Sequence, residues 1–124
     1  MRFGRAPDPV AEALSKTLRD PSHAPAFFKA LLTSKLFSFE VGGKLVHYPD
    51  GAGEPFIPIF TRAELAPSPP SGAVVLEREG RELLELARGS GRIVINPGRK
   101  EFKAFSAEDV ERILDRLVVS RFQV

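Results

Sequence analysis

The segment RIVINPGRK, residues 92–100, brings together the residue types that come nearest to a binding chemistry. A turn at Pro97 and Gly98 would leave backbone N–H groups exposed, and the cations Arg99 and Lys100 follow directly, so the segment could bind an anion. A phosphate-binding loop usually has more glycines and leads straight into a helix, whereas the residues RKEFKAF intervene here. The candidate ligand-binding residues are Asn96, Gly98, Arg99 and Lys100.

The same residues also have a purely structural interpretation. Proline fixes φ at the first corner of a turn, and glycine supplies the positive φ that a type II turn requires at the second. Asn96 can hydrogen-bond its own downstream backbone. We favour the structural turn, because the helix start of a phosphate loop is missing, and we keep the ligand site as the alternative.

Ser38, His47 and Asp50 are the one combination that suggests nucleophilic catalysis. A predicted hairpin places Ser38 across from His47, and Asp50 follows three residues later. A serine hydrolase needs its serine on a constrained turn beside an oxyanion hole, but Ser38 lies in the middle of a predicted strand. A polar pair on the solvated face of a hairpin explains the arrangement better. We expect no catalytic residues and no enzyme activity.

Metal, cofactor and nucleic-acid binding all lack support in the composition. With two histidines and no cysteine, a zinc site has too few ligands, and we expect no metal and no cofactor. The net charge is only +2, and the nearest group of cations, Arg99, Lys100 and Lys103, is interrupted by Glu101. Because nucleic-acid binding draws on several clustered cations, this composition disfavours it.

The compartment and the stability of the protein are also suggested by composition. No apolar run reaches the ~20 residues that a membrane helix needs, and the N-terminus lacks the apolar region of a signal peptide. Without cysteine there is no disulfide framework, and we expect a cytoplasmic protein. A single Asn, Gln and Met beside 11 prolines suggests heat stability, although a GC-rich genome would produce the same bias. A melting temperature in the mesophile range would contradict heat stability.

Hydrophobic periodicity predicts a single α+β domain over residues 1–124, with a mixed sheet of five or six short strands and flanking helices. Residues 1–7 are expected to be a flexible N-terminus and 118–124 a C-terminal tail. Helices are predicted to begin at Pro9, at Pro25, at the capping boxes of Thr61 and Ser106, and at Gly80, the one that starts at Ser106 reaching Leu117. The predicted strands are 36–41, 44–48, 56–60, 73–76, 92–95 and 101–105.

Two pairings follow from this order of elements. Residues 36–48 read as a hairpin with a turn at Gly42 and Gly43, an aromatic face, and a solvated face that carries Ser38. Strands 73–76 and 93–95, joined by a helix, would run parallel if they are neighbours. The predicted hairpin pairs are Val41 with Lys44, Glu40 with Leu45, Phe39 with Val46 and Phe37 with Tyr48.

Exposed apolar residues suggest an interaction surface. The C-terminal residues VVSRFQV are more apolar than a free terminus usually is. Pro58 within an otherwise apolar strand suggests a sheet edge. Either feature could support a homodimer or contact with a protein partner. The candidate interface residues are Pro58, Phe102, Phe105, Phe122 and Val124.

Four segments, in this order, resemble the N-terminal domain of the bacterial SseB family: APAFFKALLTSKLFSF, FIPIFTRAEL, GRELLELARGSGRIVINPG and KAFSAEDVERIL. The resemblance spans roughly residues 8–117, and the order of the segments is more specific than any one of them. It implies a bacterial, cytoplasmic domain of unresolved role, in a family of which many members carry a second domain. Arg99 stands where relatives often have Ser, and Phe102 where Gly commonly precedes the Lys.

These observations favour a non-enzymatic domain that works through protein contact or as a regulatory module. The polar residues are too few and too scattered in the sequence to predict convergence on a substrate. The alternative is a small-ligand or anion-binding domain that uses the turn from Asn96 to Lys100.

Overall fold

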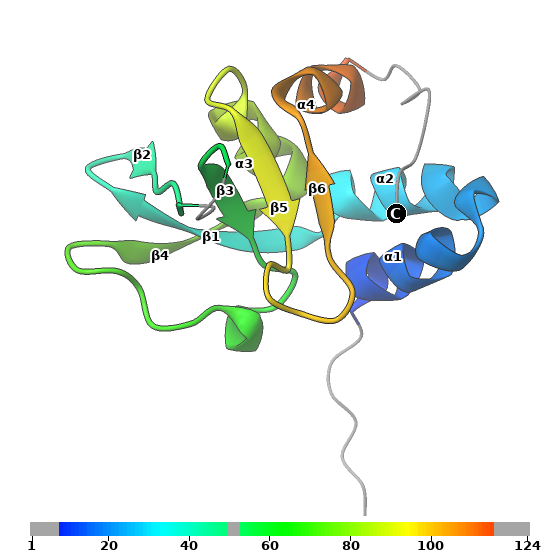
Figure 1. Ribbon diagram of the computed structural model, residues 1–124, viewed down its shortest axis with the longest axis horizontal. Coiled ribbons are helices and arrows are strands. Elements are labelled where there is room, and N and C mark those ends of the chain that lie inside the picture. Colours follow the sequence, from blue (N-terminus) through cyan, green and yellow to red (C-terminus); the bar gives the residue numbers. More distant parts are fainter. Residues whose placement is uncertain (1–7, 50–52, 116–124) are drawn as a thin grey trace, which may run out of the picture.

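The structure, a computed structural model, describes residues 8–49 and 53–115. Within these ranges the chain forms four α-helices, two short 3-10 helices and two three-stranded sheets (Figure 1). This confirms the predicted α+β class with six short strands, although the strands divide between two sheets. The predicted flexible N-terminus, the C-terminal tail, Phe122 and Val124 lie outside the described residues.

Two of the helices begin where their capping residues predict. Helix α1 (Pro9–Arg19) starts after Asp8, whose side chain accepts a hydrogen bond of 2.9 Å from the Ala11 N–H, with Pro9 in the first turn. Helix α4 (Ala107–Leu114) starts with a capping box between Ser106 and Asp109. The other α-helices are α2 (Ala24–Thr33) and α3 (Gly80–Ala87), and the 3-10 helices are η1 (Pro21–His23) and η2 (Ala63–Leu65).

The first sheet, sheet A, contains β1 (Lys35–Val41), β2 (Lys44–Leu45) and β4 (Val74–Glu79) in the order β2-β1-β4, all antiparallel. The second, sheet B, contains β3 (Phe56–Ile59), β5 (Arg92–Ile95) and β6 (Lys103–Phe105) in the order β3-β5-β6, with β3 and β5 parallel. An antiparallel bridge between Phe37 and Phe60 joins the two sheets.

Two predicted pairings were wrong. Strands 73–76 and 93–95 are not neighbours, because β4 pairs with β1 and β5 pairs with β3. In the hairpin, Val41 pairs with Lys44 and Glu40 with Leu45 as expected, and the Val46 N–H still donates to the Phe39 carbonyl at 2.9 Å before the two segments separate. Phe37 pairs with Phe60 and Tyr48 pairs with Phe56. The predicted pair of Phe37 with Tyr48 is therefore replaced by pairs with the segment around β3.

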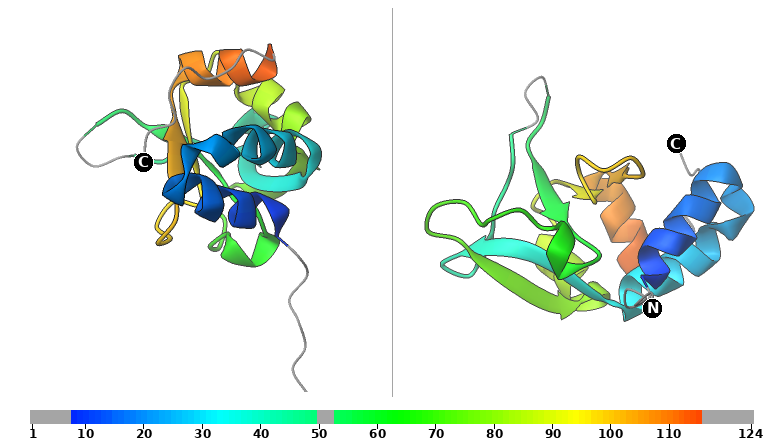
Figure 2. Two further views of the ribbon diagram at one scale, coloured as in Figure 1. Left: turned by 90° about the vertical axis from the view of Figure 1, so that its right-hand side faces the viewer. Right: turned by 90° about the horizontal axis from the view of Figure 1, so that it is seen from below.

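The main core lies between the inner face of sheet B and the helices. Ile57, Ile59, Ile93 and Ile95 are fully buried there, together with apolar residues from all four α-helices. Figures 1 and 2 show α1 and α2 side by side at one end of the sheets. Arg88, at the end of α3, connects α3 to α4 through bonds of 2.8 Å to both Glu111 and Asp115. These two carboxylates raise the pKa of Arg88 above its ordinary value.

Ser38 supplies a hydrogen bond where the two sheets meet. It is fully buried, so the predicted solvated face of the hairpin was wrong, and its Oγ donates to the Pro58 carbonyl at 2.6 Å. Pro58 has no N–H of its own to offer a neighbouring strand. The backbone hydrogen-bond ladder is therefore interrupted at Pro58, and the Ser38 hydroxyl supplies a donor to the Pro58 carbonyl there.

Replacing Ser38 with alanine should lower the free energy of unfolding by about 1–3 kcal/mol, because a buried carbonyl would lose its donor. Urea denaturation followed by circular dichroism measures the change. The exposed loop residue Ser71 provides the matched control, since Ser71→Ala should have almost no effect. Equal stability of the two variants would contradict the assignment.

Candidate functional site

The Asn-Pro-Gly turn connects β5 to the segment before β6. The Arg99 N–H donates to the Asn96 carbonyl at 3.2 Å, and Gly98 has φ +81°, as a type II turn requires at its second corner. Asn96 itself has φ +52°, a left-handed conformation that asparagine tolerates better than most residues. The predicted type II turn is therefore confirmed, and the residue at its start is also left-handed.

The Asn96 side chain does not bond its own downstream backbone, as the sequence suggested, but reaches across to Thr61. Its Oδ1 accepts from the Thr61 N–H at 3.0 Å, and its Nδ2 donates to Thr61 Oγ1 at 3.0 Å. Both residues are buried. Thr61, predicted to open a capping box, thus has a different role, and η2 begins without a side-chain cap.

Thr61 extends this network to the start of α1. Its Oγ1 donates to Asp8 Oδ2 at 2.8 Å, while Asp8 Oδ1 accepts from the Ala11 N–H. Three segments that are distant in sequence are therefore held together by side-chain hydrogen bonds. The sequence carried no signal for this connection, since each of the three polar residues has a sufficient local explanation.

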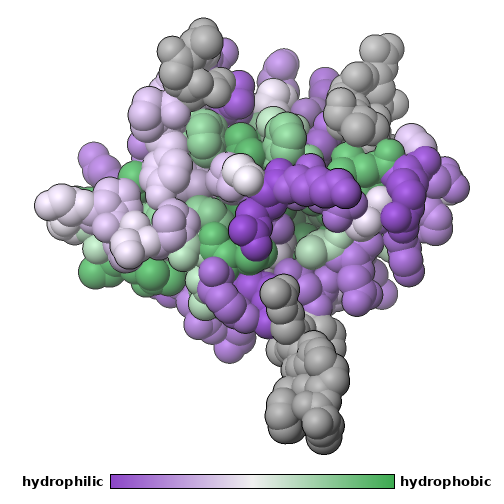
Figure 3. All heavy atoms as spheres, turned by 60° about the horizontal axis from the view of Figure 1, so that its bottom comes forward, coloured by the Kyte–Doolittle hydropathy of each residue, from purple (hydrophilic) through white to green (hydrophobic). Residues whose placement is uncertain are grey.

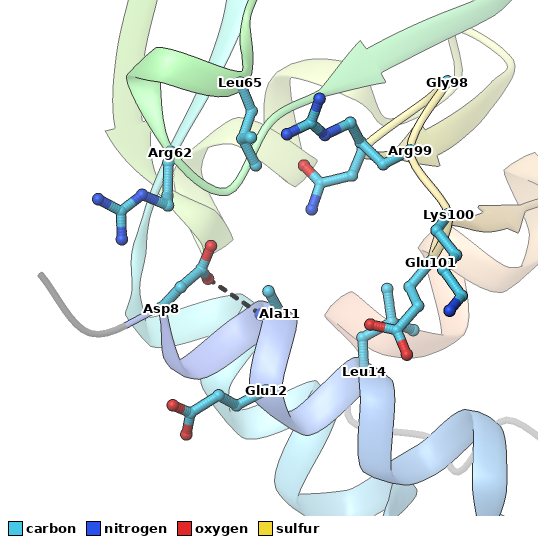
Figure 4. A pocket seen from close by; sticks show the side chains of 11 residues that line it. Asp8, Ala11, Glu12, Leu14, Arg62, Leu65, Gly98, Arg99, Lys100 and Glu101 are labelled. Carbon is cyan, nitrogen blue, oxygen red and sulfur yellow. Dashed lines mark hydrogen bonds between the residues drawn. The ribbon is translucent and has the colours of Figure 1, made fainter. Parts of the chain in front are cut away.

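A cavity of about 620 Å³, here called the turn pocket, opens beside this network. All four predicted ligand residues, Asn96, Gly98, Arg99 and Lys100, line it. Helix α1 forms the opposite wall with the side chains of Asp8, Ala11, Glu12 and Leu14, and Arg62, Leu65 and Glu101 complete the lining (Figure 4).

The charged side chains that line the turn pocket differ in whether they form hydrogen bonds or ion pairs. Arg62 is paired with Glu64, and Glu101 accepts a hydrogen bond of 2.8 Å from Ser15. The exposed side chains of Arg99 and Lys100 make no hydrogen bond or ion pair with any residue that the structure describes. Arg99 extends into the space above α1, whereas Arg62 points away from it (Figure 4).

A second cavity of about 350 Å³, the outer groove, lies on the other side of the same turn. Val94 and Ala104 are cross-strand neighbours on the face of sheet B that points away from the main core. Phe102 stands at the edge of this groove with 53% of its surface exposed. The lining is apolar apart from two arginines and contains no carboxylate; it consists of Phe56, Arg92, Val94, Pro97, Gly98, Arg99, Phe102 and Ala104.

The remaining interface candidates occupy different environments. Pro58 is buried, and Phe105 is buried with its ring stacked 6.1 Å from that of Phe27, so neither side chain is on the surface of the monomer. Among the described candidates, only Phe102 is exposed. Three further apolar residues that the sequence pattern does not single out, Val41, Val74 and Val75, are exposed at one end of sheet A. On the face shown in Figure 3, hydrophilic side chains separate several apolar areas.

The residues considered for catalysis do not converge where they are described. Ser38 bonds Pro58, whereas His47 Nε2 lies 2.8 Å from the Ser90 carbonyl, and Asp50 is outside the described residues. Within the described ranges, no three potential metal ligands from His, Cys, Asp and Glu gather in one place. Nor is any helix in these ranges long and apolar enough to cross a membrane.

Comparison with known protein families identifies the family of this chain. The model of the SseB protein N-terminal domain matches residues 10–112, which include the turn, the lining of both cavities apart from Asp8, and most of the core. No curated protein gave a match. Because the matched region covers most of the 124 residues, the chain belongs to the SseB family and contains its N-terminal domain.

Proposed function

We propose that this domain is a non-enzymatic binding module that holds a segment of a partner protein in the outer groove. The observation that carries the proposal is the position of Phe102, a large apolar side chain that is more than half exposed beside an apolar groove. Exposed aromatic residues next to a concave surface are typical of protein-binding sites. A regulatory role in the bacterial cytoplasm agrees with this mode of action.

The charges around the groove define the chemistry of the partner. Arg92 and Arg99 line it, and no carboxylate does. The Arg92 guanidinium lies 5.9 Å from the centre of the Phe56 ring, which keeps positive charge at the apolar floor. Complementarity therefore favours a segment in which an apolar side chain fills the groove and neighbouring acidic residues meet the arginines.

Selection from a phage-displayed library of random peptides tests the proposal, because it requires no identified partner. The selected peptides should share an aromatic or large aliphatic residue with Asp or Glu within two positions. Phe102→Asp should weaken their binding by at least about tenfold, because the variant places a charge in the apolar contact. Affinity should also fall as salt is raised, since Arg99 is exposed to screening.

Leu86 on α3 provides the matched control, because 49% of its surface is exposed and it does not line the groove. Leu86→Asp should leave peptide binding unchanged. Selection of peptides without acidic residues, or equal loss of binding in both variants, would contradict the proposal. Sedimentation equilibrium provides a second check: self-association that Phe102→Asp abolishes would identify a second copy of the chain as the occupant and contradict a separate partner.

A further inference from the structure

One wall of the turn pocket carries Arg99 and Lys100, followed by Glu101, whose carboxylate accepts a hydrogen bond from Ser15. The Arg99 side chain is exposed, has no partner among the described residues and extends into the cavity (Figure 4). A guanidinium in such a position can bind a carboxylate through two parallel hydrogen bonds. Lys100 adds a second positive charge at the rim. This wall is therefore suited to the anionic end of a ligand.

The opposite wall is acidic. Asp8, the N-cap residue of α1, directs its carboxylate toward the cavity, and Glu12 in the first turn lines the edge of the cavity with its carboxylate turned outward (Figure 4). Each oxygen of Asp8 already accepts one hydrogen bond, and each has a further lone pair that can accept another. Glu12 is exposed and has no partner among the residues that the structure describes. These carboxylates repel a polyanion and attract an ammonium group.

The size and rigidity of the cavity suit a small molecule. Its volume of about 620 Å³ lies in the range of small-ligand sites, and Ala11, Leu14 and Leu65 give it apolar surface between the charged walls. The hydrogen bonds from Asn96 through Thr61 to Asp8 connect the turn to the start of α1. The backbone of the turn and the start of α1 are thus connected by one hydrogen-bond network that is present without a ligand.

We propose that the turn pocket binds a small zwitterion, with its carboxylate on Arg99 and its ammonium group on the side of Asp8 and Glu12. This inference does not depend on the proposed protein partner, because Phe102 does not line the turn pocket. Arg99 borders both cavities, so the experiments use further residues to separate them.

Three four-carbon probes distinguish the contributions of the two walls: 4-aminobutyrate carries both charges, butyrate the anion alone, and n-butylammonium the cation alone. Titration followed by two-dimensional amide NMR should show 4-aminobutyrate shifting the amides of residues 98–101 and of the first turn of α1. Its affinity should exceed that of butyrate by about fivefold, the effect expected for one partly exposed ion pair. The weakest binding is expected for n-butylammonium, which cannot engage Arg99.

Matched substitutions test the two anchors. Arg99→Ala should weaken 4-aminobutyrate binding by about tenfold or more, whereas Arg78→Ala on sheet A removes the same charge and should change nothing. Glu12→Gln should lower the preference over butyrate, and Glu108→Gln, an exposed acidic residue in the first turn of α4, should not. Each variant is first checked for a native amide spectrum.

Butyrate binding as tightly as 4-aminobutyrate would overturn the inference, as would unchanged binding in Arg99→Ala. Shifts confined to residues outside the turn pocket would do the same. Phe102→Asp separates this inference from the proposed function: it should abolish peptide binding and leave 4-aminobutyrate binding intact.

Discussion

Replacing Gly80 with alanine should lower the free energy of unfolding by more than about 3 kcal/mol, and the variant is expected to be largely unfolded if the domain is marginally stable. A Cβ at this position would overlap the carbonyl oxygen of Leu31 and lie 2.8 Å from its carbonyl carbon. Both atoms belong to the backbone of α2, which cannot move aside as a flexible side chain could. The Gly80 N–H also donates to the Ser34 carbonyl at 2.8 Å, and this hydrogen bond holds the start of α3 close to the end of α2.

Urea denaturation followed by far-ultraviolet circular dichroism measures this effect. Leu86→Ala in the same helix is the control, because truncating an exposed side chain should change stability by no more than about 0.5 kcal/mol. A Gly80→Ala protein within about 1 kcal/mol of the parent chain, the range of a tolerated substitution, would show that α2 and α3 are not packed as described.

Replacing Asn96 with alanine should lower the free energy of unfolding by about 2–4 kcal/mol. The substitution leaves the buried N–H of Thr61 without the Asn96 acceptor and places an alanine at φ +52°. Asn96→Gly separates the two causes, because glycine adopts this conformation without strain. We expect it to be less destabilising than Asn96→Ala by about 1 kcal/mol.

Chemical denaturation of both variants, together with Thr61→Val, checks the assignment. The valine variant loses the Oγ1 contacts to Asn96 and Asp8 but keeps its backbone N–H bond to Asn96. Its effect should therefore be non-additive with that of Asn96→Gly, as expected for residues in one network. Strict additivity would mean that the two side chains do not act together.

The sequence was sufficient where the cause is local. The acceptor of Asp8 followed by Pro9 predicts the start of α1, and Ser106 with Asp109 predicts the start of α4, because capping bonds join residues three positions apart. The Pro97 and Gly98 corners predict the turn from their own conformational limits. These elements do not depend on the rest of the fold.

The sequence was insufficient where a residue has two adequate partners. Thr61 is followed by a glutamate at the spacing of a capping box, and nothing local indicates that it instead bonds Asn96 and Asp8. The aromatic residues of the hairpin could pair with one another or with the apolar strand that follows. The choice depends on long-range packing, since Phe37 and Tyr48 both bridge to the segment around β3.

For the candidate site, the four predicted ligand residues lie within five consecutive positions, and they do line one cavity. On the opposite wall, Asp8 has a sufficient local explanation as the cap of a helix, and nothing in the sequence singles out Glu12. Phe105 shows the reverse error: the sequence cannot distinguish an exposed phenylalanine from one that packs on Phe27. Which face a short strand turns inward is decided by its neighbours in space.

The pairing of β1 with β4 and of β3 with β5 has a consequence for synthesis of the chain. In chain order the strands are β1, β3, β4 and β5, so the two pairings are interleaved rather than nested. A nascent polypeptide that has left the ribosome only as far as residue 79 can form the first pairing, but the parallel one must await Ile95. β3 is therefore synthesised before its partner β5. At a synthesis rate of about 5–20 residues per second, β3 stays without β5 for on the order of seconds.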